Sequence, residues 1–213
     1  DMNTSYALFS TAYFPPISYV AATLDKQAVA VEHYDTFPKQ TYRNRAVVAT
    51  ANGLLPLSVP VIRTNGNHTY TKDMDICYNE NWAAKHWRAI ESAYNSSPYF
   101  LYYKDDVEAI LNKKHRTLLE LNMDILEFVF KKLKVAKDII LSTDFVVVDA
   151  NADIEDYRNR FSPKNKEIIQ LPPYDQVFED RYGFQQDLSI LDLLFNMGPD
   201  SLGYLKEVAK ILG

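Results

Sequence analysis

Two short apolar runs near the start of the chain, separated by a helix that opens on a proline pair, limit what this sequence can fold into. Tyr6–Tyr13 and Ala28–Glu32 have the length and composition of strands, and Pro15 and Pro16 open a helical segment that runs through Leu24. Proline suits a first helical turn because its φ is already fixed and its missing N–H would have no partner there. A strand, a crossover helix and a second strand pair in parallel. The sequence therefore predicts a β-α-β unit whose strands end at one edge of a sheet.

A hairpin is expected next. Two apolar, β-rich runs, Ala46–Thr50 and Leu55–Ile62, flank the dipeptide Asn52–Gly53. Asn-Gly between such runs is a strong hairpin signal because both residues tolerate a positive φ. Residues 72–78 are a candidate for a further strand.

The rest of the chain is mostly helical in its spacing, with apolar residues at intervals of three and four. The expected helices are 82–94, 99–111, 117–136, 189–197 and 202–212, the expected strands are 139–141 and 145–148, and residues 162–173 read as a loop. No stretch resembles a linker between two cores. The expected fold is therefore one α/β domain over residues 1–213, a mixed β-sheet with the β-α-β unit and hairpin, covered by a central helical block and C-terminal helices.

Composition excludes several classes of protein. The 213 residues carry 23 Lys and Arg against 28 Asp and Glu, a net charge of -5, so there is no basic footprint for nucleic acid. One cysteine, Cys77, excludes an intramolecular disulfide and fits a reducing compartment. No apolar run approaches the roughly 18 residues of a membrane span, and no signal peptide is visible. We expect a cytoplasmic protein without a membrane span.

Short motifs supply little chemistry. The six glycines are scattered, so no glycine-rich phosphate loop exists, and the four histidines lack metal-ligand spacing. We expect no metal and no cofactor. The tetrapeptide Tyr-Arg-Asn-Arg occurs at 42–45 and again at 157–160, in dissimilar contexts, and we interpret the repeat as coincidence.

Asp73 and Asp75 match the Asp-x-Asp pattern by which many sugar-nucleotide transferases hold a divalent metal. Carboxylates suit Mg²⁺ that bridges a diphosphate. The alternative is a half-exposed strand in which Met74 and Ile76 face inward and both aspartates face water.

The segment from Glu32 to Arg45 is the candidate for anion binding. Glu32 ends an expected parallel strand, and ligands of open α/β sheets gather outside the carboxyl ends of strands. If residues 42–46 are extended, Arg43 and Arg45 share one face. A guanidinium recognises carboxylate or phosphate through two parallel hydrogen bonds. The alternative is a solvated charged rim.

Two polar residues lie on apolar helical stripes. His86 follows Trp82 by four residues and precedes Ile90 by four, so it is either a core-edge histidine or a general base held near neutrality by partial burial. A nucleophile pair with Cys77 is conceivable, although a lone cysteine is more often a small buried hydrophobe. Asn122 occupies a similar apolar position, where a buried amide must find partners or a ligand.

A set of short motifs runs in order through nearly all of the chain: Tyr13–Phe14–Pro15–Pro16 and Tyr19; Lys39, Tyr42 and Asn44–Arg45; Leu57–Ser58–Val59–Pro60; Trp82, Lys85–His86, Ile90, Ala93–Tyr94 and Pro98–Tyr99–Phe100; Asn122; then Tyr174, Gln176 and Leu188–Asn196. In these motifs and their order, the chain resembles the WbqC-like protein family. It departs from the family pattern at Thr11–Ala12, where many members have Gln-Pro, and at Glu32–His33, which replace an Asp-rich turn.

Members of this family resemble proteins encoded in O-antigen and other surface-polysaccharide gene clusters. Transfer of glycine to an amino sugar has been suggested for the family. The resemblance implies a transferase that acylates or aminoacylates an amino-sugar nucleotide. Lys39 and Arg45 would hold a diphosphate or carboxylate, Asn44 would orient it, and His86 or Glu32 would take a proton from the sugar amine. The further substrate-binding candidates are Tyr13, Tyr94 and Asn122.

Two other functions stay open: a non-catalytic protein that binds a sugar nucleotide or a partner enzyme, and a metal-dependent glycosyltransferase that uses the Asp-x-Asp motif. Two structural predictions follow. The strands that end near Tyr13 and at Glu32 should lie side by side in parallel. The side chains of Lys39, Asn44, Arg45 and His86 should face one pocket, with Arg45 substantially buried.

Overall fold

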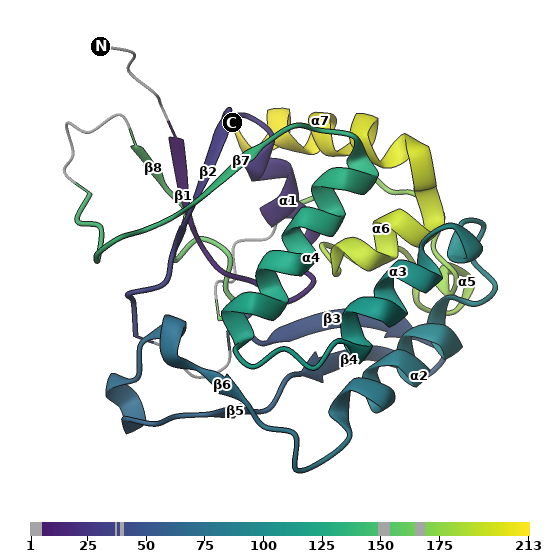
Figure 1. Ribbon diagram of the computed structural model, residues 1–213. Helices are drawn as coiled ribbons and strands as arrows, with labels where there is room; N and C mark the ends of the chain where they lie inside the picture. The colour runs from purple at the N-terminus through teal and green to yellow at the C-terminus, as the bar shows by residue number, and fades with distance from the viewer. Residues whose placement is uncertain (1–5, 37, 39–40, 149–153, 165–168) are drawn as a thin grey trace.

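The computed structural model describes residues 6–36, 38, 41–148, 154–164 and 169–213 (Figure 1). The predicted β-α-β unit is present as β1 (Tyr6–Ser10), α1 (Ile17–Thr23) and β2 (Ala28–Glu32). The two strands pair in parallel over their whole length, from Tyr6 opposite Ala28 to Ser10 opposite Glu32. The prediction of parallel strands that end together is confirmed.

β1 is shorter than the apolar run that predicted it. The strand ends at Ser10, and the chain then turns through Phe14, whose φ is 37°. The Ser189 hydroxyl donates to the Phe14 carbonyl oxygen at 2.8 Å and holds this turn. Pro16 is the N-cap residue of α1, so the proline pair stands just before the helix and not inside it.

β1 and β2 belong to a four-stranded sheet that is parallel throughout. The order is β7-β2-β1-β8, with β7 at Asp138–Leu141 and β8 at Ile154–Asp156. The chain therefore builds outward from β1 through β2 to β7 and then returns to the other side of β1 for β8. Ligands of open parallel sheets bind at the carboxyl ends of strands where the order reverses, which here is between β1 and β8.

The strand predicted at 145–148 is wrong. These residues are irregular. The backbone N–H of Val146 donates to a carboxylate oxygen of Glu32 at 2.8 Å, and its carbonyl oxygen accepts from the Arg158 guanidinium at 2.6 Å. Because side chains satisfy these backbone groups, the segment needs no strand partner.

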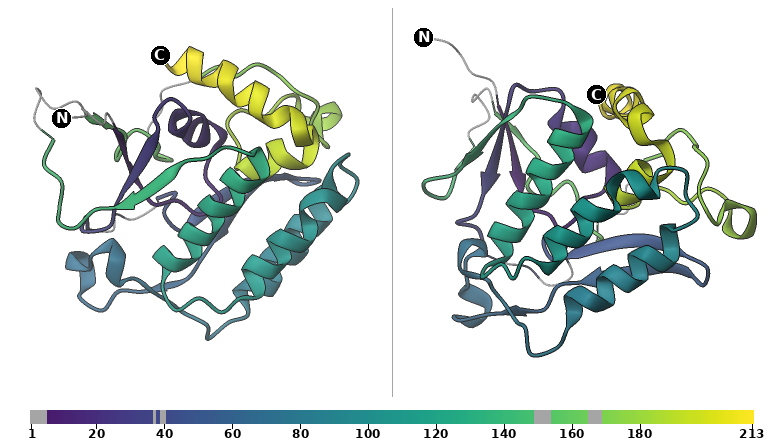
Figure 2. Two further views of the ribbon diagram at one scale, coloured as in Figure 1. Left: turned by 45° about the horizontal axis from the view of Figure 1, so that its top comes forward. Right: turned by 45° about the vertical axis from the view of Figure 1, so that its right-hand side comes forward.

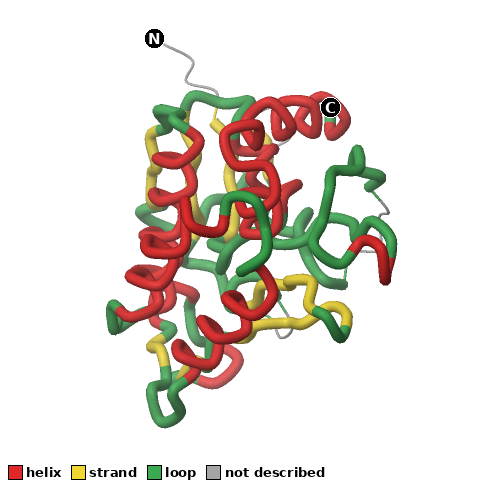
Figure 3. Tube along the Cα trace, turned by 90° about the vertical axis from the view of Figure 1, so that its right-hand side faces the viewer, coloured by secondary structure: helices red, strands yellow, loops and turns green. Residues whose placement is uncertain are grey.

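The predicted hairpin is β3 (Arg45–Thr50) and β4 (Gly53–Ser58), and it forms an antiparallel sheet apart from the parallel one (Figure 3). Gly53 takes up a φ of 108° next to the turn. A third small sheet joins β5 (Val61–Ile62) to β6 (Asp75–Ile76), the part of the predicted strand 72–78 that is extended. Short 3-10 turns lie at 66–68, 71–73 and 198–200.

The helices after the hairpin are α2 (Trp82–Tyr94), α3 (Phe100–Asn112), α4 (Leu118–Leu133), α5 (Glu179–Tyr182), α6 (Ile190–Met197) and α7 (Ser201–Leu212). All of them except the short α5 were predicted, with ends that differ by at most three residues. A capping box at Thr117 and Glu120 starts the longest of them, α4. α7 packs along α1, and α2 packs on both α3 and the hairpin (Figure 2). One cluster of buried apolar side chains joins the parallel sheet, the hairpin and the helices.

The α/β class of the prediction is confirmed, with the parallel and antiparallel pairs in separate sheets. Among the residues that the structure describes, no helix combines the length and the apolar character that crossing a membrane requires.

Candidate functional site

Charged residues gather where β1, β2 and β8 end. Glu32 is the last residue of β2, and its side chain is fully buried. One carboxylate oxygen accepts from the Arg158 guanidinium at 3.0 Å and from the Val146 N–H, and the other accepts from the Ser142 hydroxyl at 2.5 Å. A buried carboxylate needs such partners because removing it from water is costly.

Arg158 follows the end of β8 and makes a second contact there. Its guanidinium forms a two-pronged pair with Asp156, at 3.0 and 2.9 Å. These hydrogen bonds lower the pKa of Asp156 and raise that of Arg158, so the pair is charged at neutral pH. The Arg158 side chain is 11% exposed, which leaves part of its surface open to the outside.

Arg43 approaches the same place from the loop before the hairpin. It is 7% exposed, and it pairs with Asp35 at 2.6 Å. The same guanidinium donates to the hydroxyl oxygens of Ser10 and Thr41, at 2.8 and 2.9 Å, while its buried Nε has no hydrogen-bond partner. The Ser10 hydroxyl in turn donates to the Arg158 carbonyl oxygen at 2.9 Å. Ser10, the last residue of β1, therefore ties the two arginine segments together.

Both arginines line an open hollow of about 350 Å³, which we call the carboxyl-end crevice. Its rim carries Phe145, which is 51% exposed and has the Arg158 guanidinium 5.0 Å from its ring centroid. Guanidinium groups recognise phosphates and carboxylates, and an exposed aromatic ring offers a surface for a second ring. The lining residues are Asp35, Thr36, Pro38, Arg43, Phe145, Arg158 and Asn159.

The repeated tetrapeptide marks this crevice. Its two copies, at 42–45 and 157–160, each contribute their first arginine, Arg43 and Arg158, although the segments are more than a hundred residues apart. The interpretation of the repeat as coincidence therefore misses a useful signal. It is the one feature of the sequence that could have identified Arg158.

His86 lies in the core, not in the crevice. Its Nδ1 accepts from the Tyr13 hydroxyl at 2.7 Å and its Nε2–H donates to the Ser58 carbonyl oxygen at 3.1 Å, a tautomer that satisfies both contacts. Burial lowers the pKa of His86 to about 4, against a smaller opposite effect of the Ser58 carbonyl. The imidazole is therefore neutral at pH 7. Because both nitrogens are bonded, the hypothesis of a pair with Cys77 does not hold.

Arg45 and Asn44 serve the hairpin. Residues 42–43 form a turn, and β3 begins only at Arg45. Residues 42–46 are therefore not one extended segment, and the expected alignment of Arg43 with Arg45 on one face does not occur. The Asn44 amide donates to the Val59 carbonyl oxygen at 2.9 Å. Arg45 is half-buried, and its buried Nε has no hydrogen-bond partner.

The structure describes three of the four residues that were predicted to share a pocket: Asn44, Arg45 and His86. Arg45 lies directly across from Ser58 in the hairpin register, and the Ser58 carbonyl oxygen accepts from His86, so these two residues approach the same strand end. Lys39 lies outside the described residues. Glu32, the other candidate base, is at the crevice, where its carboxylate is bound to Arg158.

Asn122 and Tyr94 have different surroundings. The Asn122 amide donates to the Arg43 carbonyl oxygen at 2.8 Å, so α4 holds the backbone of the loop that carries Arg43, and the buried Oδ1 of Asn122 has no partner. The Tyr94 hydroxyl donates to the Asp192 carboxylate at 2.8 Å and not to a residue of the crevice. The same carboxylate accepts from Tyr174 and from a glutamine amide, and burial raises its pKa.

The Asp-x-Asp motif has cationic neighbours. Asp73 accepts from Lys72 at 3.1 Å, and Asp75 lies 3.7 Å from Arg116. Met74, between them, is fully buried, as expected, but the strand contains only Asp75 and Ile76, and Asp73 belongs to a 3-10 turn. Across the described ranges, no group of three or more His, Cys, Asp or Glu side chains is placed to hold a metal ion.

The fold and these contacts define an α/β protein with one buried and one half-buried arginine at the carboxyl end of its parallel sheet. The chain belongs to the WbqC-like protein family, whose model matches residues 11–160, more than half of the chain. It is similar to "Uncharacterized protein Rv1507c" of Mycobacterium tuberculosis (strain ATCC 25618 / H37Rv), at 26% identity over 196 residues that cover 80% of this chain and 84% of the relative. No solved structure matches the chain.

Proposed function

We propose that this protein binds a phosphate-bearing sugar precursor, of the sugar-nucleotide type, in the carboxyl-end crevice. One observation carries the proposal: Arg43 and Arg158, both largely buried and held by carboxylates, converge on an open hollow at the strand ends of a parallel sheet. Fixed guanidinium groups recognise a diphosphate without first being ordered. Phe145 would stack on the base or the sugar.

We further propose that the bound precursor is an amino sugar of surface-polysaccharide biosynthesis and that the protein transfers an acyl or aminoacyl group to it in the cytoplasm. The family resemblance supports this part. The sugar amine would attack the carbonyl carbon of an activated acyl donor, for example an activated glycine. A C–N bond forms, the bond between the carbonyl carbon and the activating group breaks with its electron pair on that group, and the proton lost by the amine passes to the departing group or to water.

In this proposal Glu32 and Asp35 are positioning residues, because each holds one of the two arginines. We assign no proton transfer to His86, since both of its nitrogens are bonded in the core.

A non-catalytic binding protein is the second candidate. The carboxylates at the crevice, Glu32, Asp35 and Asp156, are each paired with an arginine. Their oxygens already accept hydrogen bonds from guanidinium groups, and this occupation favours binding without a transfer step.

A thermal-shift screen of UDP- and dTDP-amino sugars tests binding. A ligand at 100 times its Kd stabilises the fold by about 2.7 kcal/mol. Arg43→Lys and Arg158→Lys keep the charge but lose the planar fork, so we expect affinity to fall roughly tenfold for each. Arg88→Lys, on the exposed face of α2, is the matched control and should change affinity less than twofold.

If no sugar nucleotide shifts the melting temperature, or if Arg88→Lys weakens binding as much as Arg43→Lys, the binding proposal fails. If an amino-sugar nucleotide does bind, incubation of the complex with an activated glycine donor separates the two candidate functions. Formation of an amide product identifies a transferase, whereas saturable binding without product identifies a binding protein.

A further inference from the structure

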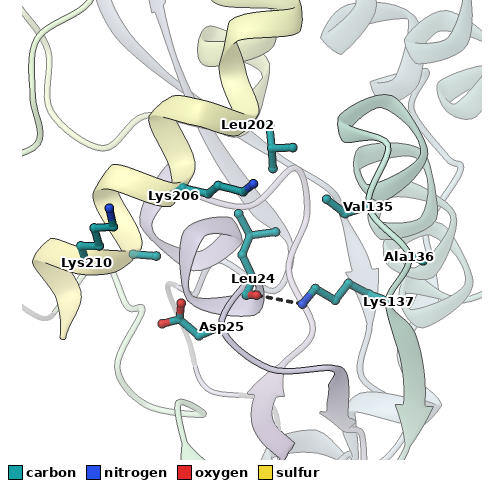
Figure 4. Close-up of a pocket in the computed structure, with 9 residues that line it drawn as sticks. Leu24, Asp25, Val135, Ala136, Lys137, Leu202, Lys206 and Lys210 are labelled. Carbon is teal, nitrogen blue, oxygen red and sulfur yellow. Dashed lines mark hydrogen bonds between the residues drawn. The ribbon is translucent and has the colours of Figure 1, made fainter.

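A second hollow, of about 500 Å³, lies at the opposite end of the parallel sheet, and we call it the amino-end hollow (Figure 4). Three segments surround it: the turn after α1, the connection from α4 to β7, and one face of α7. Its size is within the range of small-molecule sites. The lining residues are Leu24, Asp25, Val135, Ala136, Lys137, Leu202, Lys206, Ala209 and Lys210.

Lys137 is fixed at one side of this hollow. Its ammonium group donates to the Leu24 carbonyl oxygen at 2.8 Å and also to the Lys26 carbonyl oxygen. Burial lowers the pKa of Lys137, with Asp25 opposing that effect. An ammonium group has three donors, and these two carbonyl groups use two of them. One donor therefore stays available on an already ordered side chain.

Lys206 and Lys210 stand one turn apart on α7 and line the other side. Figure 4 shows Lys137 and Lys206 extending from opposite sides toward Leu24. Within the described part of the chain, neither lysine of α7 forms an ion pair. Like charges four residues apart destabilise a helix by roughly 0.2–0.5 kcal/mol. Lys210 suits the C-terminal end of the helix dipole, but Lys206 is a turn too early to gain much from it.

The remaining wall is apolar. Leu24, Val135 and Leu202 are half-buried and face the hollow, and Ala209 lies between the two lysines of α7. With three lysines and one aspartate around it, the hollow is locally positive on a protein whose net charge is -5. It combines a cationic rim with an aliphatic surface.

We propose that the amino-end hollow binds a small soluble phosphate monoester with an aliphatic body. The phosphate lies between Lys137 and the lysines of α7, and the aliphatic part covers Leu24, Val135 and Leu202. A phosphate dianion fits better than a carboxylate because three ammonium groups surround the hollow. This site is separate from the carboxyl-end crevice and does not depend on the function proposed there.

The test uses octyl phosphate, below its micellar concentration and at low salt, in isothermal titration against the full chain. Inorganic phosphate and octyl glucoside serve as probes that lack the chain or the charge. Each exposed ammonium contact is worth up to about 1 kcal/mol, or roughly fivefold in affinity. Lys206→Ala should therefore weaken octyl phosphate binding severalfold, and the double variant with Lys210→Ala more than tenfold.

The matched control is Lys131→Ala, an exposed lysine of α4 outside the hollow, which should change the affinity less than twofold. Leu202→Ala should weaken octyl phosphate and leave inorganic phosphate unaffected, with circular dichroism to confirm that the variant is folded. The proposal is overturned if the double variant binds like the wild type, or if inorganic phosphate binds as tightly as octyl phosphate. Adsorption to phosphatidic acid vesicles without binding of octyl phosphate would also overturn it, since the lysines would then only attract a membrane surface.

Discussion

Replacing Arg158 by methionine should strongly destabilise the fold, because it leaves the carboxylate of Glu32 buried without its cation. The Glu32 side chain is fully buried and that of Arg158 is 11% exposed. Breaking a buried ion pair from one side costs about 3–5 kcal/mol. Glu32 keeps its hydrogen bonds from Ser142 and Val146, so we expect a value near the lower end.

Urea unfolding at pH 7 measures this loss of free energy. In a thermal melt, the same loss should lower the melting temperature by about 6–20 °C. The double variant Glu32→Gln with Arg158→Met removes both charges and should recover most of the loss, giving a coupling free energy of about 2 kcal/mol or more. Lys132→Met is the control. It breaks a partly exposed pair with Asp106, at 2.7 Å, and should cost no more than about 1 kcal/mol. The reasoning is refuted if Arg158→Met costs no more than this control and the coupling is zero.

Three further predictions concern single positions. Burial lowers the pKa of His86 to about 4, so as the pH falls this histidine gains its proton in the unfolded chain before it does in the folded one. The fold should therefore lose about 3 kcal/mol of stability between pH 6.5 and pH 4. Urea unfolding across this pH range measures the loss, and the variant His86→Leu should not show it. Asp192→Ala leaves three buried donors without their acceptor and should cost roughly 3 kcal/mol or more in urea unfolding, whereas a cost below about 1 kcal/mol would contradict the hydrogen-bond explanation. Gly198 and Gly66 share a φ of 52°, but a Cβ at Gly198 would lie 2.4 Å from the Tyr99 ring and one at Gly66 would meet nothing within 4 Å. Thermal melts should therefore show Gly198→Ala to be less stable than Gly66→Ala by about 1–3 kcal/mol, and equal melting temperatures would count against this steric clash with Tyr99.

The elements with a strong local signal could be predicted from the sequence. The β-α-β unit, the hairpin around Asn52–Gly53 and the helix that starts at Thr117 all depend on periodicity, turn residues or caps within a few positions. β8 could not be predicted, because its three residues are Ile154, Glu155 and Asp156, and two charged residues do not read as a buried strand. Its pairing with β1 is a long-range choice that no local pattern contains.

The sequence predicts the strand end at the crevice but not which arginines line it. Glu32 does end a parallel strand, and the crevice opens at this edge of the sheet. Which arginine reaches that edge depends on the turn at 42–43, which directs Arg43 to Asp35 and leaves Arg45 to start the hairpin. Arg158 reaches the crevice only through the pairing of β8 with β1, so periodicity alone could not place it.

The ion pair between Glu32 and Arg158 also sets an order of events during synthesis. The two residues are 126 positions apart. At roughly 5–20 residues per second, the ribosome needs about 6–25 s after Glu32 before it makes Arg158. Throughout that interval the β-α-β unit can form, but the end of β2 carries a carboxylate whose cation does not yet exist. The carboxyl-end crevice therefore cannot reach its final form until the ribosome has made Arg158, and before that point Glu32 has no ionic partner from the segment after β8.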